Sequence, residues 1–361
     1  MNSNVSKTKL VSFISIVIAI IILGHYWNIH NGYKNEVSSR SQSSDEKLPE
    51  GSDKKRKYIV TNNVEFKMET KQTQKILTKC GDTEEDIRRS TLEQVKPLFP
   101  KVPQSHKIKK GIEPLCREDT RPIPDNRLTD EESKRQQSCI NNFKTDHAKG
   151  SGQFWSGDTQ FIRHKHHKYL NSESVVLDIG GNKGEDAEAI IKAYNPGVYV
   201  ILEPIKTLYK ALITMFKKNP NVVLYDFGLG KKNDKFFVNV VGHGGDATSV
   251  FIENNKKDSC LLRVYNTTEL LIRLGVSCFD VDLITINCEG CEYDILETLL
   301  STNITQRFRH IQFATHPTLK HLKQPAERYC EIQEKLSRTH VISYQYKFCW
   351  ESWTRKDIAT K

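Results

Sequence analysis

The second half of the chain alternates short apolar runs with amphipathic stretches. The apolar runs predict strands at Val175–Ile179, Val198–Glu203, Val222–Asp226, Phe236–Val241, Asp282–Cys288, Ile311–Thr315 and Val341–Tyr346. Stretches of helical period predict helices at Gly184–Tyr194, Ile205–Lys218, Cys291–Leu300 and Pro325–Ser337. Strands that alternate with helices predict an α/β domain over residues 151–361, with a doubly wound, mainly parallel sheet. Such folds bind ligands along the edge where the parallel strands end.

One segment near the N-terminus is apolar enough to cross a membrane. The stretch LVSFISIVIAIIILGHYW covers residues 10–27 and would span about 27 Å as a helix. Lys7 and Lys9 precede it, which predicts a cytoplasmic tail at residues 1–9. We therefore expect a single-pass type II membrane protein of the Golgi or endoplasmic reticulum, with its remaining chain in the lumen. A cleaved signal peptide is the alternative, but no small-x-small site follows Gly24.

Residues 28–150 lack the alternation of the second half. Residues 28–70 are rich in Ser, Asn, Lys and Glu, which predicts a flexible stem. Prolines break up residues 71–150, and this stretch is expected to be an irregular lumenal region. Within it, Thr83–Val95 is predicted to form a short helix capped by Asp82.

Cysteines and glycosylation triplets agree with a lumenal location. The chain has nine cysteines, and an oxidising lumen would permit several disulfides while leaving at least one thiol unpaired. We expect Cys80, Cys116 and Cys139 to link the irregular region to itself or to the domain that follows. Asn266-Thr267-Thr268 and Asn303-Ile304-Thr305 are acceptor triplets for N-glycosylation.

The charge of the chain argues against nucleic acid as a partner. The net charge is +10, yet the densest basic run is only Lys54–Lys57, and elsewhere acidic residues interleave with basic ones. Nucleic-acid-binding proteins concentrate their positive charge on one face or stripe. The histidine-rich run Arg163–Lys168 is expected to be a solvated basic face, with contact to an anionic substrate as the alternative.

The stretch VVLDIGGNKGE is the sharpest chemical signal in the sequence. A β-branched strand ends near Asp178, a turn with Gly180, Gly181, Asn182 and Gly184 follows, and then a helix begins. Glycines let the backbone approach a ligand closely, and a helix start offers free N–H groups. The spacing G-G-x-x-G differs from the dinucleotide fingerprint. An acid at the strand end suits a cationic amino-acid group better than a pyrophosphate, although the motif could be only a tight turn.

Two further acids follow predicted strands. Glu203 closes the next strand, where an acid can accept hydrogen bonds from both hydroxyls of a ribose. Asp226 ends the strand after that and could meet an adenine amine, or it could simply form a turn before Gly228. A nicotinamide-dependent oxidoreductase would use the same sheet and Glu203, but the glycine spacing and Asp178 speak against it.

The stretch DLITINCEGCEYDIL runs from a buried strand into a helix. It places Glu289 at the same ligand-binding edge as Asp178 and Glu203. The alternative is an acid that complements the helix dipole. Cys288 and Cys291 have the spacing of a metal or redox pair, but no second pair completes a zinc site. The favoured interpretation is therefore that Cys288 and Cys291 are core thiols or form a disulfide, and no metal is expected.

The order of these motifs resembles that of FkbM-type S-adenosylmethionine-dependent methyltransferases. The motifs are DIGGNKG, ILEP, GGDATSVF, DLITINCEGCEYDIL and HIQFATHP, and the resemblance covers roughly residues 152–350. It implies a Rossmann-like methyltransferase fold, S-adenosyl-L-methionine as the cofactor, and methyl transfer to a hydroxyl oxygen. Its cofactor motifs fall on Asp178, Gly180, Asn182, Gly184 and Glu203, and its E-G-x-E motif falls on Glu289, Gly290 and Glu292.

The sequence also departs from the family pattern. Asn287 stands where the family usually has Asp, Thr285 replaces the usual Lys, and Ala314-Thr315 stands where an acid commonly precedes the histidine. A hydroxyl acceptor is a poor nucleophile and needs a general base, for which Glu289 and His316 are the candidates. The predicted function is O-methylation of a hydroxyl, such as that of a glycan sugar, in the secretory lumen. The alternative is a non-catalytic, membrane-anchored binding module with the same fold.

Overall fold

A computed structural model describes residues 76, 78–89, 91–108, 118–241, 248–251 and 259–359. The predicted membrane segment, the predicted stem, Cys116 and the first half of GGDATSVF lie outside these residues. Among the helices of the described residues, none has the length and apolar character that a membrane span requires.

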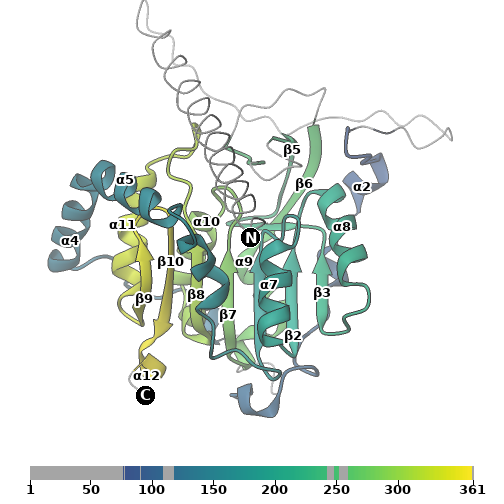
Figure 1. The fold of residues 1–361 in the computed structure, drawn as a ribbon, viewed down its shortest axis with the longest axis horizontal. Coiled ribbons are helices and arrows are strands. Elements are labelled where there is room, and N and C mark those ends of the chain that lie inside the picture. The colour runs from purple at the N-terminus through teal and green to yellow at the C-terminus, as the bar shows by residue number, and fades with distance from the viewer. Residues whose placement is uncertain are drawn as a thin grey trace, which may run out of the picture. The chain divides into compact units, whose positions relative to one another are not determined.

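The main sheet has seven strands in the order β3-β2-β1-β7-β8-β10-β9 (Figure 1). The strands are β1 Val175–Ile179, β2 Val198–Leu202, β3 Val222–Tyr225, β7 Val281–Ile286, β8 Phe308–Ala314, β9 His340–Tyr346 and β10 Trp350–Arg355. The first five in this order pair in parallel, whereas β10 runs antiparallel to both of its neighbours. The predicted α/β class with a mainly parallel, Rossmann-like sheet is confirmed for the described residues.

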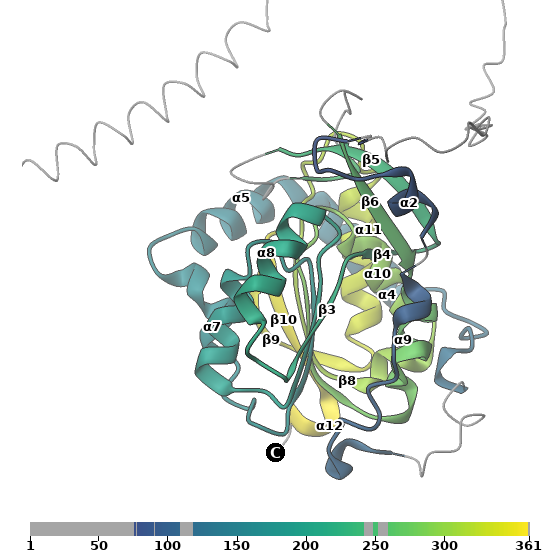
Figure 2. The ribbon, with the colours of Figure 1, turned by 90° about the vertical axis from the view of Figure 1, so that its right-hand side faces the viewer.

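Helices cover both faces of this sheet. They are α6 Ile162–Lys165, α7 Glu185–Tyr194, α8 Lys206–Phe216, α9 Thr267–Leu274, α10 Glu292–Leu300, α11 Pro325–Leu336 and α12 Lys356–Ala359. Figure 2 shows α7 and α8 on one side of the strands and α9 and α10 on the other. Successive side chains of β1 divide between the two faces: Leu177 and Ile179 join the core that includes α10, and Val176 joins the core under α7 and α8. Burial on both faces explains why β1 and β2 are mainly apolar runs in the sequence.

A second sheet has three strands in the order β4-β6-β5. Its strands are β4 Gly228–Gly230, β5 Asp234–Asn239 and β6 Ser259–Asn266. The run predicted at Phe236–Val241 is a strand, but it pairs antiparallel with β6 and is not part of the parallel sheet. The alternation of residues predicts a strand without specifying its partner, because the partner is set by tertiary packing.

The described part of residues 71–150, which was predicted to be irregular, contains more helix than its prolines suggested. Its helices are α2 Glu84–Arg88, α4 Asp130–Asn141 and α5 Phe143–Phe154, and α5 crosses residue 150. Short 3-10 helices lie here and further along the chain at Leu92–Gln94, Gln104–His106, Glu118–Thr120, Thr159–Phe161, Val276–Cys278 and Asn303–Arg307. The helix predicted at Thr83–Val95 is shorter than expected. Thr83 caps it in a reciprocal pair with Asp86, whereas the predicted cap Asp82 instead accepts the N–H of Leu261.

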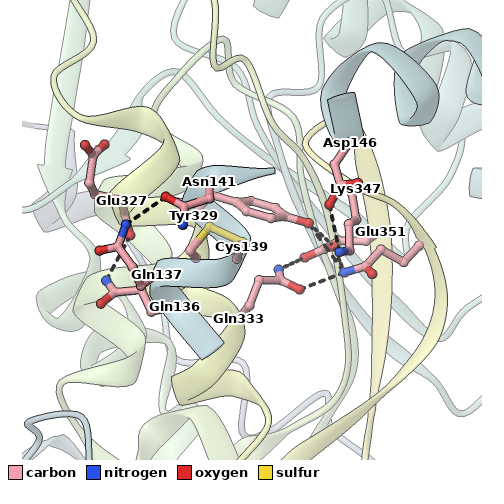
Figure 3. The surroundings of a disulfide bond; sticks show 12 residues. Gln136, Gln137, Cys139, Asn141, Asp146, Glu327, Tyr329, Gln333, Lys347 and Glu351 are labelled. Carbon is pink, nitrogen blue, oxygen red and sulfur yellow. Dashed lines mark hydrogen bonds and ion pairs between the residues drawn. A yellow bond between two sulfur atoms is a disulfide. The ribbon is translucent and has the colours of Figure 1, made fainter. Parts of the chain in front are cut away.

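Disulfides fasten this region to the α/β domain, as predicted for Cys80 and Cys139. Cys80 is bonded to Cys260 of β6, and Cys139 of α4 is bonded to Cys330 of α11 (Figure 3). These bonds join residues that are 180 and 191 positions apart. They therefore restrict the unfolded chain strongly. Among the described residues, Cys349 is a free thiol.

Candidate functional site

The glycine turn after β1 passes between the ends of β2 and β7. The N–H groups of Gly180 and Gly181 both donate to the carbonyl of Leu202, at 2.9 and 3.0 Å. Gly180 has φ +95°, and a Cβ added there would lie 1.9 Å from the carbonyl oxygen of Asn287. A side chain at this position would thus collide with β7, so the turn requires glycine. Gly184 closes the turn as the N-cap of α7.

Asp178 lies at the end of β1 and lines a small cavity of about 130 Å³. Its carboxylate is almost fully buried and accepts a hydrogen bond from the Tyr199 hydroxyl at 3.0 Å. Burial raises the pKa of Asp178 to about 7, and the nearby carboxylate of Asp186 adds to the rise. Asp178 thus lines a cavity at this strand end, and its contact with a ligand stays a prediction.

Positive charge reaches the same small cavity from α6. Arg163 lines it, and its Nε lies 3.0 and 3.1 Å from the two oxygens of Asp186. His164 also contacts Asp186, and His167 is fully buried, where desolvation lowers its pKa to about 4. The expectation of a solvated basic face is wrong for these three residues, because Asp186 of α7 pairs with Arg163 and His164, and His167 is buried.

Glu203 follows β2 and lines a larger cavity of about 480 Å³. Its Oε1 accepts the N–H of Ile205, and its Oε2 accepts the N–H of Asn182, each at 2.7 Å. Burial nevertheless raises the pKa of Glu203 to about 7 against the effect of these two bonds. A carboxylate has about four acceptor positions, so Glu203 can still accept two hydroxyl groups.

The larger cavity has apolar walls and a polar end. It lies where β1, β2 and β7 end, beside the three-stranded sheet, with Leu208, Leu229, Phe236, Phe251, Leu262 and Val264 among its lining residues. Gly180, Asn182 and Asn287 line both cavities, so the two meet at the glycine turn. Oδ1 of Asn182 is buried and has no hydrogen-bond partner among the described residues. It is therefore a buried acceptor that a ligand could satisfy.

Glu289, Glu292 and His316 form a charged cluster beside the larger cavity. Oε1 of Glu289 lies 3.2 Å from Nε2 of His316, and Oε1 of Glu292 lies 3.0 Å from Nδ1, the latter as an ion pair without hydrogen-bond geometry. Burial would lower the pKa of His316, but the two carboxylates together raise it to about 10. His316 is then an imidazolium at neutral pH and cannot accept a proton. Glu289, which lines the cavity, is the one of the two predicted bases that can.

Asp226 lies apart from the predicted site residues that line the cavities. Its Oδ2 accepts from Nη2 of Arg263 at 2.6 Å and from Nη2 of Arg89 at 2.9 Å. It is not among the described residues that line either cavity. A contact of Asp226 with adenine stays a prediction, and the observed role of this carboxylate is to pair two arginines.

Two residues of the site had no role assigned from the sequence. Glu292 is fully buried, and its carboxylate accepts the N–H groups of Cys288 and Gly290 at 2.8 and 2.7 Å. Ser249 donates to the carbonyl of Glu289 at 2.6 Å. The position of Glu292 in the first turn of a predicted helix was a signal for such capping. Ser249 lies in the motif GGDATSVF, but nothing in the sequence indicated its contact with Glu289.

Cys288 and Cys291 are joined by a disulfide, which the sequence analysis had favoured over a metal site. Among the described residues, no group of His, Cys, Asp and Glu side chains is arranged to hold a metal ion.

No protein-family model and no curated protein sequence matches the chain. Solved structures with a similar fold include the methyltransferase FkbM from Methylobacillus flagellatus KT, with 12% identity and a TM-score of 0.36, covering 67% of this chain and 58% of that one. The chain thus spans less than two thirds of that protein. Precorrin-6y C5,15-methyltransferase from Geobacter metallireducens GS-15 has 11% identity and a TM-score of 0.30, covering 56% of this chain and 90% of that one.

TrmK from M. capricolum, in complex with S-adenosyl-homocysteine, has 11% identity and a TM-score of 0.27, covering 54% of this chain and 68% of that one. A methyltransferase FkbM and a precorrin-6y C5,15-methyltransferase are therefore among the similar structures, and the TrmK structure holds S-adenosyl-homocysteine. Likeness at this level establishes neither an activity nor a ligand, which have to be argued from the site.

Proposed function

We propose that the protein is an S-adenosylmethionine-dependent methyltransferase. The observation that carries this proposal is a pair of buried carboxylates, Asp178 and Glu203, on successive strand ends, in two cavities that meet at the glycine turn. A ligand that fits both needs a cationic group at one end and vicinal hydroxyls further along. S-adenosylmethionine has an α-ammonium for Asp178 and a ribose for Glu203. Asn182 lines both cavities, and its buried Oδ1 is an acceptor without a partner among the described residues.

The small cavity suits the zwitterionic end of this cofactor in particular. Asp178 offers a carboxylate to the ammonium, and Arg163 lines the same cavity with a guanidinium for the cofactor's carboxylate. The apolar walls of the larger cavity suit the adenine ring. The bound cofactor supplies an electrophilic methyl group on a sulfonium.

On the acceptor side, Glu289 is the group that receives the proton of the attacking hydroxyl. It lines the larger cavity, and the His316 imidazolium, itself held by Glu292, fixes its Oε1. Methyl transfer is an in-line displacement, for which positioning supplies much of the catalysis. The ion pair with the half-buried His316 imidazolium orients the Glu289 carboxylate in this way.

The acceptor is a hydroxyl, and we propose a glycan sugar in the secretory lumen. The disulfides support a lumenal domain, because such bonds persist in oxidising compartments. Phe236 and Phe251 give the larger cavity aromatic surfaces, and Lys232 and Asp234 add polar groups to its lining. The membrane anchor at residues 10–27 is part of the same proposal and rests on the sequence.

A non-catalytic binding module is the second candidate. Two observations favour it: Asn287 lines both cavities where the family usually has an acid, and His316 is engaged by two carboxylates. Such a module would bind the cofactor without transferring its methyl group.

Calorimetric titration of the full chain with S-adenosylmethionine, and separately with NAD, tests the proposal. We expect S-adenosylmethionine to bind and NAD not to bind, and Asp178→Ala to abolish binding while the matched exposed control Asp158→Ala retains it. Transfer of labelled methyl groups to a panel of glycans then separates the candidates. An enzyme loses transfer but keeps binding in Glu289→Gln, whereas a module shows no transfer in any form. A folded protein that binds no S-adenosylmethionine would contradict both.

A further inference from the structure

The turn that carries Glu289 is closed by a covalent bond. Cys288 precedes Glu289, Cys291 follows Gly290, and the disulfide between the two cysteines spans Cα atoms 5.4 Å apart. Both cysteines line the larger cavity, as Glu289 does. The bond therefore lies in the wall of the proposed acceptor site, directly around the residue to which the base role is assigned.

This disulfide differs from the two that fasten the domain. Those bonds link residues 180 and 191 positions apart, whereas Cys288 and Cys291 are separated by three. The restriction that a disulfide places on the unfolded chain grows with the length of the loop it closes. The Cys288–Cys291 bond therefore constrains little beyond the conformation of its own turn.

That conformation is one that an unconstrained chain rarely adopts. Glu289 has φ +56° and Gly290 has φ +107°. A non-glycine residue in the left-handed region persists only where its surroundings enforce it. Here the noncovalent support is the carboxylate of Glu292, which holds the N–H groups on either side of Glu289, and the hydroxyl of Ser249, which holds its carbonyl.

We propose that the Cys288–Cys291 disulfide is a positioning element that holds the Glu289 carboxylate against His316 at the cavity wall. When a dithiol reduces it, two electrons and two protons convert the disulfide to two thiols, the reductant becomes a disulfide, and the turn is released. Glu289 then leaves the left-handed conformation and its contact with Nε2 of His316. This role rests on the proposed function: the redox state of Cys288 and Cys291 would control the position of Glu289, the proposed base.

The contact between Glu289 and His316 can be followed without substrate or cofactor. The charged groups that face the imidazole are Glu289 and Glu292, so loss of Glu289 lowers the midpoint of the His316 titration. We would measure this midpoint by NMR of 13C-labelled histidine in the full chain, with the resonance assigned from His316→Asn. The variants are Glu289→Gln, the pair Cys288→Ala with Cys291→Ala, and the combination of all three, with Cys349→Ala as the control for removal of a free thiol.

Glu289→Gln should lower the midpoint by about one pH unit. The paired cysteine variant should lower it by a similar amount although Glu289 is still present, and the triple variant should show no further change. An unchanged midpoint in the paired variant would overturn the proposal. So would an effect of Glu289→Gln that is equally large with and without the disulfide, because Glu289 would then still contact His316.

A second measurement applies if the paired variant does not fold. Cys260 and Cys330 are fully buried, whereas Cys288 and Cys291 line a cavity, so brief treatment with dithiothreitol should reduce the latter pair first. Alkylation and mass spectrometry identify the reduced cysteines, and the His316 midpoint should fall with the reduced fraction. A midpoint that stays constant as this fraction rises contradicts the proposal. Because the titration uses no cofactor, it can fail while S-adenosylmethionine still binds, and the reverse also holds.

Discussion

Replacing Asp178 with Asn should stabilise the protein at pH 8 while it removes cofactor binding. Asp178 is 5% exposed, and burial raises its pKa from 3.8 to about 7. The folded state therefore disfavours the ionised carboxylate relative to the unfolded chain. The pKa is raised on folding, so the stability linked to this group is fully present below about pH 4 and is lost as the pH rises through 7.

The size of the effect follows from the shift in pKa. A rise of about three pH units corresponds to about 4 kcal/mol in the free energy of unfolding, and about 3 kcal/mol of this is lost between pH 5 and pH 8. Asn has the same shape, cannot ionise, and still offers an oxygen to the Tyr199 hydroxyl. The advantage of Asp178→Asn over the wild type should therefore be about 3 kcal/mol greater at pH 8 than at pH 5.

Urea unfolding at the two pH values, without reductant so that the disulfides stay intact, measures this difference. Asp158→Asn, at an exposed position, is the matched control for removal of a carboxylate. A stability difference between Asp178→Asn and wild type that is the same at pH 5 and pH 8 would refute the reasoning. Unchanged affinity of Asp178→Asn for S-adenosylmethionine would also refute it, because the Asp178 carboxylate would then make no contact with the cofactor.

Three further predictions concern other parts of the site and its surroundings. Gly180→Ala would place a Cβ 1.9 Å from the carbonyl oxygen of Asn287. It should therefore reduce the free energy of unfolding by about 2–3 kcal/mol and lower the melting temperature in a thermal scan by several degrees. An unchanged melting temperature would show that the turn has room for a side chain. Glu203→Gln should weaken S-adenosylmethionine binding about tenfold in calorimetry, since an amide NH2 cannot accept a ribose hydroxyl; equal affinity would place the ribose elsewhere. Asn303 is exposed, whereas the side chain of Asn266 caps the N-terminus of α9. In protein produced by secretory cells, mass spectrometry should therefore find a glycan on Asn303 and none on Asn266. A glycan on Asn266 and none on Asn303 would contradict this prediction.

The parallel core of the fold could be predicted because its strands are buried on both faces. All five residues of β1 are buried, and the same is true of β2. Burial of this kind leaves a continuous apolar run in the sequence, bounded by glycine or polar residues. The glycine turn was also predictable. The close approach of Gly180 to Asn287 leaves no space for a side chain, and this requirement appears in the sequence as a glycine directly after the strand.

The last strand, β10, could not be predicted for a physical reason. Its sequence WESWTR looks half polar, yet Glu351 is 1% exposed. The fold satisfies this carboxylate with hydrogen-bond donors. The Tyr329 hydroxyl donates to it at 2.8 Å (Figure 3). The side-chain amide of Gln345 also donates to it, at 2.7 Å. Burial of a charge depends on donors from distant segments, which a local pattern does not reveal.

The residues of the site were easier to predict than their ionisation. The carboxyl ends of parallel strands share one edge, so Asp178, Glu203 and Glu289 come to neighbouring positions as the sequence order indicates. The protonation of His316 depends instead on Glu292, whose carboxylate lies 3.0 Å from the imidazole only in the folded chain. The choice between the two candidate bases therefore had to await the three-dimensional arrangement.

The two cavity carboxylates carry an energetic cost that the fold alone does not explain. Burial raises the pKa of Asp178 and that of Glu203 to about 7, so each is only partly ionised at neutral pH and each opposes folding when it ionises. A neutral residue at either position would relieve this cost. A bound ligand would offset this cost. An ammonium group beside Asp178 favours its ionised form, and hydroxyl groups that donate hydrogen bonds to Glu203 favour the ionised form of that residue. Strongly perturbed carboxyl groups in a cavity are typical of functional sites. Stability gained together with affinity lost in Asp178→Asn is therefore the result that separates a ligand site from a structural feature of the sheet.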